Sequence, residues 1–583
     1  MNGSGYKPTP DEDRYNLIVD KTILEMTTLA TARSFLNILC EEVAARVAPA
    51  WSGHFVFGGD PIPYQKHTEL QADSTGMMAL SRFMAICDSL LTPKNQMWHT
   101  LGPEDDNLLK DPAVRLWFYN TTRKLFKYRY APVANFSAQN QAVFHSLGAF
   151  GTGINMIDQF YDMTGHKKAL RYKNVPFGEI YLKQDHQGRY NGFIRRLRYT
   201  AAEAYTAFAD VADRLPQMIK DAADKKSQRK FIFLHHVCAN DQYNPGMLDY
   251  NGMPYASWYI CMDTRTFLRE GGYFTLPIAA SRYYQGPNEQ DGRGVAMDVL
   301  PSLKTLDAEK RMFLTQGHRA GAPVLLLQDD GLMNMNLKPG AQNRGGWSAD
   351  GKPLVGVLPS GEIQVTETMM AEEKNLVNDA FLVALFQIMT EKNGMTATEV
   401  IERVNEKGIL IAPTLSRQEG EYLGSLIDRE LVCLADMGVL DPMPPALVEA
   451  GGHYAVTYTS PLAKAMRAQE ASGFFRTLEG VKELVAITQD QSLLHPFAFK
   501  RAIPAIAEIQ GVPEPWMATA EEIKEKEQIA AQAAKQQQQI QAAPAAAAMM
   551  KAQAAQQKAG GPAPPPPSPT AVPPPPLTAP TGA

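Results

Sequence analysis

The spacing of apolar residues predicts that the first 150 residues are mainly helical. Over residues 13–50, apolar side chains recur at the three- to four-residue spacing of one helix face. Residues 74–92 repeat this spacing and end before Pro93, because proline cannot continue a helix. Residues 109–150 are also helical in pattern and rich in aromatic side chains.

Between residues 150 and 290 the pattern changes to short β-type runs. Residues 180–183 and 190–199 have the composition of strands and flank a turn-forming sequence, Asp185-His186-Gln187-Gly188. Residues 200–223 return to helical spacing. Three further runs predict strands: 230–237, 257–263 and 273–284. The pattern therefore predicts a mixed domain here, within a chain that is α+β but mainly α.

Two long helices with an insert between them are predicted next. The first extends from Gly294 to Arg319, and Pro301 must lie in its first turn or bend it. The second extends from Ile363 to Thr390, with acidic residues at its start and apolar residues at its end. Residues 322–360 contain a short apolar run and several glycine and proline pairs, which indicate a compact loop-and-strand insert.

A tight loop and a new helix follow the second long helix. Asn393-Gly394 tolerates positive φ and predicts a turn. Thr396 and Glu399 have the spacing of a capping box, so a helix should begin there and stop at Gly408. A long helix, a tight loop and a restarted helix form a local architecture and not a catalytic motif.

The remainder of the chain is helical at first and of low complexity at its end. Ser416 and Glu419 are spaced as another capping box, and Gly438 ends that helix. Residues 519–542 are rich in Glu, Lys, Gln and Ala, which favour helix. After Gly560 the chain is rich in proline, cannot form a packed core and is expected to be extended and disordered.

The composition is that of an ordinary globular protein and excludes some classes of function. Of the 583 residues, 45% are hydrophobic and 20% charged, and the net charge is −5. This charge argues against a protein that coats nucleic acid with a basic surface, but not against one that lets DNA slide past. The five scattered cysteines indicate reduced thiols. The N-terminus lacks a signal-peptide core, and the longest apolar run is about half the ~20 residues that span a bilayer, so no membrane anchor is expected.

Some residues that carry chemistry elsewhere fit structural roles better here. Gly148 to Gly153 lacks the Lys-Ser/Thr of a phosphate-binding loop, so we interpret it as close packing or a helix end. His235 and His236 are adjacent in a predicted strand and point to opposite faces, so they cannot easily bind one metal together. His236 and Cys238 share a face, but no second ligand cluster accompanies them. We predict no metal and no cofactor.

Two charged groups are candidates for other roles. Glu372 and Asp379 lie seven positions apart, on one face of the second long helix. They could be a catalytic pair, but a solvated or channel-facing acidic stripe fits better. Arg196 and Arg198 share one face of a strand, which would either touch phosphates or face solvent. No GxSxG, HExxH or kinase motif is present, and we predict no enzyme.

Four segments resemble the portal (head-to-tail connecting) proteins of short-tailed, podovirus-type bacteriophages. They are Leu91 to Trp98, in which Lys94 replaces the usual proline, Phe150 to Gly153, Gly292 to Gly294, and Met395 to Val400. The last, Met-Thr-Ala-Thr-Glu-Val, is the most recognisable. The order and spacing of the four segments make the resemblance specific, and it covers most of residues 13–510.

The resemblance implies a portal fold and a role in moving DNA. Such proteins form rings of about twelve identical subunits at one capsid vertex, around a channel through which double-stranded DNA is packaged and ejected. A chain of this kind is made in the host cytoplasm, docks terminase and tail adaptor proteins, and contacts capsid and scaffolding proteins. The implied regions are an N-terminal wing (1–290), a stem helix (291–321), a clip (322–361), a second stem helix with a tunnel loop (362–394), wing and crown helices (395–518) and a tail (519–583).

The resemblance also implies which residues face the DNA. They are Glu372 and Asp379 of the stem, and Glu391, Lys392, Asn393 and Gly394 of the tunnel loop. An acidic channel wall repels phosphates and should limit adhesion to moving DNA. The apolar half of the second stem helix could supply the interface that closes the ring.

Two alternatives from other classes remain open at this point. One is a hydrolase with an unrecognised site, which electron microscopy would distinguish from a ring with a central hole. The other is a DNA-binding adaptor, which the salt dependence of DNA binding would identify.

Overall fold

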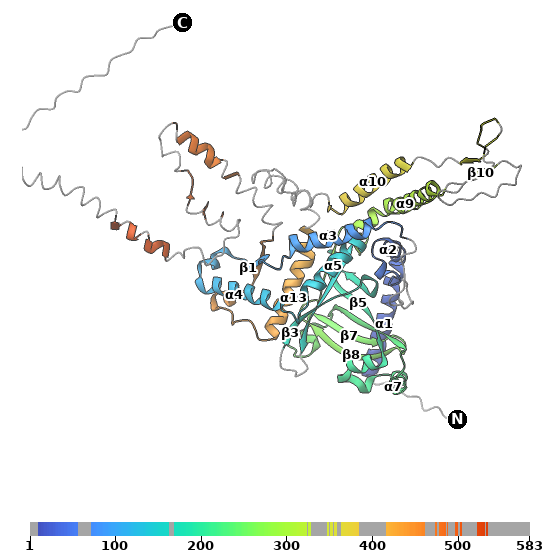
Figure 1. Ribbon diagram of the computed structural model, residues 1–583. Coiled ribbons are helices and arrows are strands. Elements are labelled where there is room, and N and C mark those ends of the chain that lie inside the picture. Colours follow the sequence, from blue (N-terminus) through green and yellow to red (C-terminus); the bar gives the residue numbers. More distant parts are fainter. Residues whose placement is uncertain are drawn as a thin grey trace, which may run out of the picture. The chain divides into compact units, whose positions relative to one another are not determined.

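The computed structural model describes residues 10–55, 71–161, 168–322, 325–327, 347–348, 350–353, 355–357, 363–383 and 416–460, with short stretches between 473 and 533 (Figure 1). Contacts divide the chain into two units, Met1–Pro496 and Phe497–Ala583. In the second unit, residues 522–526, 528–530 and 532–533 are helical, inside the segment whose composition favours helix. Among the described residues, no helix is both long and apolar enough to cross a bilayer.

Helices in the first unit largely follow the predicted positions. They are α1 (Pro10–Ala32), α2 (Ser34–Val47), α3 (Thr75–Leu91), α4 (Pro112–Arg129), α5 (Phe136–Phe150), α6 (Ala201–Ala207), α7 (Gln217–Asp224), α8 (Val295–Asp298), α9 (Leu300–Gly321), α10 (Ile363–Ala380), α13 (Gly424–Asp436) and α14 (Pro445–Glu449). Pro301 lies in the first turn of α9, as predicted. A π-helical turn, η7 (Glu419–Leu423), precedes α13, and Gly438 follows α13 in a left-handed conformation.

The strands of the described residues form four antiparallel sheets, and the chain is therefore α+β as predicted. The largest sheet contains β4 (Ile180–Gln184), β5 (Tyr190–Thr200), β6 (Lys230–Ala239), β7 (Tyr255–Cys261) and β8 (Thr266–Tyr273), in chain order. A second sheet has the order β3 (Lys168–Asn174), β2 (Thr152–Tyr161) and β9 (Ile278–Arg282). Two pairs complete the set: β1 (His99–Pro103) with β12 (Tyr454–Tyr458), and β10 (Leu325–Leu327) with β11 (Val355–Val357).

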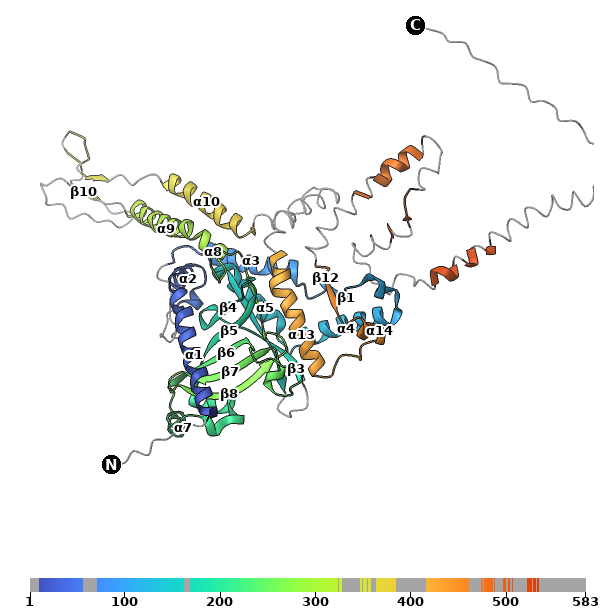
Figure 2. The same cartoon turned by 180° about the vertical axis from the view of Figure 1, so that it is seen from behind.

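Both faces of the five-stranded sheet are covered, because alternate side chains of each strand point to opposite sides. Val19 and Met26 of α1 pack with Ile194 and Leu234 on one face. Helices α6 and α7 help to form a second cluster around Phe233 on the other face. Figures 1 and 2 both show α1 running along the sheet.

The main core of the first unit lies around the three-stranded sheet. It combines buried side chains of α2, α3, α4, α5 and α13 with those of β2, β3 and β9. The sequence pattern missed β2 and β3, because the polar residues of β2 hide its apolar alternation. Asn155, for example, is buried and donates from its Nδ2 to the Tyr422 hydroxyl at 3.1 Å. Asn155 can therefore be buried in β2 because Tyr422, which is distant in the sequence, accepts its hydrogen bond.

A buried ion pair joins distant parts of this core. Arg129 of α4 and Glu430 of α13 are fully buried, and Arg129 Nη2 lies 2.5 Å from Glu430 Oε2. The Tyr172 hydroxyl of β3 also donates to Glu430, and Arg129 Nη1 lies 3.0 Å from His99 Nε2 of β1. Burial, and then the Arg129 charge, hold the pKa of His99 well below its ordinary value, so His99 is neutral and accepts. One guanidinium and one carboxylate thus fix four elements.

Helix α10 ends earlier than the predicted Thr390. It stops at Ala380, and Leu382 has φ of +61°, a left-handed conformation that leucine rarely adopts. Val377, Phe381 and Val383 are buried in the main core, and the Phe381 ring packs edge-on against Phe83 of α3. The chain turns here because these side chains pack into their own subunit. The prediction of an uninterrupted helix was wrong at this point.

Candidate functional site

Helices α9 and α10 form an antiparallel pair that carries the predicted acidic stripe. They run side by side in both views (Figures 1 and 2), and Thr366 of α10 donates to the Gln316 side chain of α9 at 3.2 Å. Glu372 and Asp379 are both exposed on α10, two turns apart, as the sequence predicted. The stripe also includes Met369 and Leu376, which are 49% and 51% exposed.

The single basic residue of α10 does not neutralise this stripe. Lys374 Nζ lies 3.4 Å from the Asp73 carboxylate, just before α3. On the face between α9 and α10, the Glu309 carboxyl is buried near Glu373, and burial and then the Glu373 charge raise the pKa of Glu309. The surface of α10 that carries Glu372 and Asp379 is therefore acidic, without a compensating cation from its own helix.

Charged residues attach the first turns of α9 to α2 and to the segment before α3. Asp307 Oδ1 accepts the backbone N–H groups of Ala72 and Asp73 at 2.9 and 3.1 Å. Arg46 lies 3.8 Å from the other oxygen of Asp307, and Lys304 pairs with Glu42 at 2.6 Å. The sequence pattern did not single out these residues, because their partners lie more than two hundred positions away.

Two of the four resemblance segments meet directly before α8 and α9. Gly151 ends α5 with φ of +77°, and a Cβ atom there would lie 2.2 Å from the carbonyl carbon of Arg293. A Cβ on Gly294 would lie 2.6 Å from the backbone nitrogen of Gly151. The Gly292 N–H donates to Thr152 Oγ1 at 2.9 Å. We name Gly151, Gly292 and Gly294 the glycine junction.

The glycine junction confirms the structural interpretation of Gly148 to Gly153. These glycines end a helix and allow two backbone segments to touch, which only residues without a side chain permit. The contact sets the point from which α8 and α9 leave the three-stranded sheet, because the Tyr283 N–H following β9 also bonds to the Gly151 carbonyl, at 2.8 Å. The junction therefore positions the first helix of the α9–α10 pair.

The structure corrects the interpretation of the arginines in β5. Arg196 was expected either to touch phosphates or to face solvent, but it is 4% exposed, on the face that packs against α1. Burial lowers the pKa of Arg196. A sheet face covered by a helix offers no access to a phosphate backbone. Arg195, on the opposite face, lies instead at a pocket that is described below.

The histidines of β6 point to opposite faces, as predicted. The His235 ring stacks on Tyr259, with ring centres 4.2 Å apart, and bonds to Ser257 at 3.0 Å. His236 faces α1, and its Nδ1 lies 2.9 Å from the Thr22 hydroxyl. Burial, followed by nearby basic groups, lowers the pKa of both rings, and that of His236 to about 3. Both rings are therefore neutral core side chains with hydrogen-bond partners.

Four of the predicted channel residues lie outside the described residues. They are Glu391, Lys392, Asn393 and Gly394, and the Met395 to Val400 segment also lies outside. The structure brings Glu372 and Asp379 together on one helix face and does not test the other four.

Comparisons with known proteins identify the family. A family model described as bacteriophage head to tail connecting protein matches residues 21–517. The chain is 24% identical over 486 residues to the portal protein of Salmonella phage epsilon15, covering 79% of this chain and 83% of the relative. It is also 24% identical over 451 residues to a probable portal protein of Bordetella phage BPP-1, covering 76% and 78% of the two chains. The family is structural and not enzymatic. The chain therefore belongs to the bacteriophage head-to-tail connecting, or portal, protein family.

Proposed function

We propose that this chain is the subunit of a ring at the capsid vertex, and that α9 and α10 form the wall of its DNA channel. The observation that carries this proposal is the exposed stripe of Glu372 and Asp379 on α10. This helix packs against α9 and is joined by the Lys374–Asp73 ion pair to the segment before α3. A wall of like charge repels phosphates, so DNA passes without adhering. Family membership supports the ring. The acidic stripe supports the choice of this face of the α9–α10 pair as the one that faces the channel.

The other regions keep the roles that the family resemblance suggests. We assign residues 1–290 to the wing, 322–361 to a clip that docks terminase and tail adaptor proteins, and 395–518 to wing and crown helices. Glu391, Lys392, Asn393 and Gly394 would form the tunnel loop, in which Lys392 can reach a phosphate. Capsid and scaffolding proteins would contact the outer parts of the ring.

Exposed apolar side chains support contacts between subunits. On α1 and α2, Leu17 and Leu24 are each 70% exposed, Phe35 is 84% exposed and Ile38 is 62% exposed. Large apolar side chains exposed on neighbouring stretches of the chain are typical of a protein interface. The apolar half of the second stem helix was expected to supply this interface. Its described residues Phe381 and Val383 are buried in the core of their own subunit, and residues 384–390 lie outside the described part of the chain.

The first prediction is that the purified chain forms closed rings. Electron microscopy should show particles with a central hole, and their mass should be a multiple of 64.3 kDa. Deleting residues 560–583 should leave the rings unchanged, because proline-rich sequence of this kind cannot pack into a core. A monomer that stays stable at micromolar concentration under several salt conditions would count against the proposal.

The second prediction concerns the channel wall. Rings carrying both Glu372→Lys and Asp379→Lys should form normally, since both side chains are exposed, but they should bind a short DNA duplex about tenfold more tightly at low salt. A matched control carries Glu104→Lys and Asp224→Lys, which change the charge equally at exposed sites outside α10. Packaging assays should show slower translocation for the first variant only. Equal affinity of the two variants for the duplex would show that α10 does not line the channel.

A further inference from the structure

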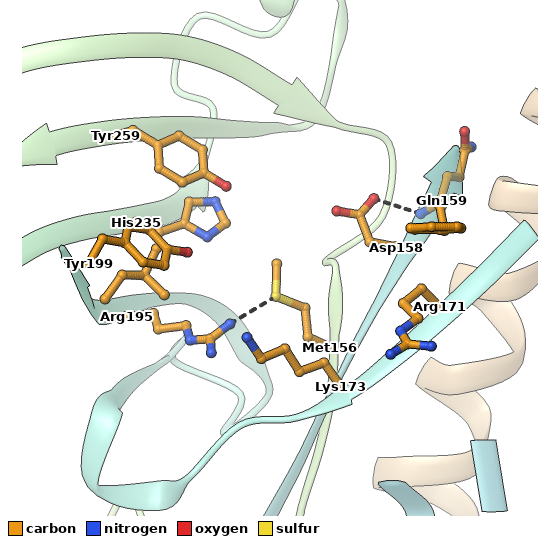
Figure 3. Close-up of a pocket in the computed structure, with 11 residues that line it drawn as sticks. Met156, Asp158, Gln159, Arg171, Lys173, Arg195, Tyr199, His235 and Tyr259 are labelled. Carbon is orange, nitrogen blue, oxygen red and sulfur yellow. Dashed lines mark hydrogen bonds between the residues drawn. The ribbon is translucent and has the colours of Figure 1, made fainter. Parts of the chain in front are cut away.

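A pocket of about 270 Å³ lies between the five-stranded and the three-stranded sheets, apart from the α9–α10 pair. Figure 3 shows its lining side chains, which come from both sheets. Strands β2 and β3 contribute Met156, Asp158, Gln159, Phe160, Arg171 and Lys173, and strands β5 to β7 contribute Arg195, Leu197, Tyr199, His235 and Tyr259. None of the functions assigned above uses this pocket.

The pairing of the strands places Arg195 and Lys173 at the pocket, each beside an uncharged side chain of the neighbouring strand. Arg195 of β5 pairs across the sheet with His235 of β6, which pairs in turn with Tyr259 of β7. Across the pocket, Lys173 of β3 is the partner of Met156 of β2. Figure 3 shows the Lys173 ammonium and the Arg195 guanidinium pointing toward one another. Two cations from different sheets therefore converge on one point.

The one ion pair that Arg195 forms among the described residues is too long for a hydrogen bond. Its side chain is 5% exposed, and its contacts are the Met156 sulfur at 3.3 Å and the Glu179 carboxylate at 3.6 Å. Its Nε is buried and has no hydrogen-bond partner among the described residues. A buried guanidinium has five N–H groups to satisfy, and a thioether is a weak acceptor. The geometry leaves room for an acceptor that the chain does not provide.

Lys173 is the second cation of the pocket, and its side chain is more exposed than that of Arg195. Among the described residues it forms no ion pair, and burial, followed by the Arg195 charge, lowers its pKa. Arg171, two positions before it on β3, is a third cation at the pocket. The one lining carboxylate, Asp158, has its closest cation, Arg429 Nη2, at 4.0 Å and outside the lining. With Glu179 counted as the ion-pair partner of Arg195, three cations face two carboxylates, and the pocket keeps an excess of positive charge.

We propose that this pocket binds one oxyanion group, a carboxylate or a phosphate, between Lys173 and Arg195. The aromatic wall of Tyr199, Tyr259 and the neutral His235 ring limits the ligand to a single group of side-chain size. Asp158 at the pocket disfavours a continuous polyanion such as a DNA strand. The inference is independent of the ring and of the channel. The group comes either from an acidic side chain of a neighbouring protein or from a phosphate compound.

Isothermal titration calorimetry of the full-length protein tests this inference, with inorganic phosphate and glutarate as probes at neutral pH and constant ionic strength. The wild type should bind at least one of them, and Lys173→Met should weaken that binding about tenfold through loss of one charge-assisted hydrogen bond. Tighter binding of glutarate would identify a carboxylate as the source, and tighter binding of phosphate a phosphate compound. Lys173 is exposed, so the variant should fold normally, and Arg171→Met is a second variant with the same expected direction.

The matched control is Lys225→Met, which removes the same charge from an exposed lysine just after α7. It should leave both affinities unchanged. Equal weakening by Lys225→Met, or no weakening by Lys173→Met, would overturn the proposal. It would also fail if neither small anion bound while a short DNA duplex bound in a manner that depends on Lys173, because the pocket would then contact nucleic acid.

Discussion

Glu430→Gln is expected to lower the free energy of unfolding by about 3–5 kcal/mol, which is the usual loss when one partner of a buried ion pair is removed. The neutral amide leaves the Arg129 guanidinium uncompensated at a site that is 0% exposed. Urea denaturation followed by tryptophan fluorescence measures the loss. Trp98 is a suitable reporter, because the Arg129 guanidinium lies 4.4 Å from its ring centre.

The matched control is Asp441→Asn. Asp441 pairs with Lys124 of α4 at 2.7 Å, but the two side chains are 48% and 28% exposed. Water solvates both charges there, so the loss should stay below about 1 kcal/mol. If the two variants lost the same stability, burial would not be what makes the Arg129–Glu430 pair important, and the account of this core would be wrong.

Gly151→Ala should be more damaging still, because two costs act together. A left-handed backbone costs an L-residue about 1–2 kcal/mol, and the φ of Gly151 is +77°. The new Cβ would also lie 2.2 Å from the Arg293 backbone, which cannot move like the end of a flexible side chain. We expect a loss above about 4 kcal/mol, the range in which a specific steric conflict must be invoked. Thermal unfolding and the yield of soluble protein measure it.

Gly188→Ala separates the two costs. Gly188 has φ of +80°, close to that of Gly151, but an added Cβ there meets nothing within 4 Å. This variant should therefore show the cost of the left-handed backbone alone, about 1–2 kcal/mol. Equal losses in the two variants would mean that the close approach at the glycine junction contributes nothing to stability.

Local sequence rules predicted much of this fold correctly. Helical spacing located α3 and α9, proline chemistry placed Pro301 in a first turn, and the period of two in a strand assigned His235 and His236 to opposite faces. The exposed positions of Glu372 and Asp379 on α10 followed from the same periodicity. These features depend on residues a few positions apart, which is the range at which sequence patterns act.

Features that depend on distant partners were not predictable in this way. A phosphate contact was considered for Arg196, but the packing of α1 against the sheet buries it. Phe381 was counted in a continuous helix, but contact with Phe83 of α3 draws it into the core. The oxyanion pocket needs two strand registers and the approach of two sheets, and neither is visible in a single run of residues. For the same reason, the sequence singled out Arg196 and Arg198 of this strand, whereas Arg195 is the one at the pocket.

The Arg129–Glu430 pair also constrains when the protein can finish folding. The two residues are 301 positions apart. Strand β1 likewise pairs with β12, which ends at Tyr458. During synthesis, α4 leaves the ribosome long before its carboxylate partner exists, so contacts of this range close late. Until then, a nascent chain must keep Arg129 in water and the core around it open. Chains that terminate before residue 430 should consequently be degraded and not incorporated into assemblies, because about three quarters of the chain must be made before this core can close.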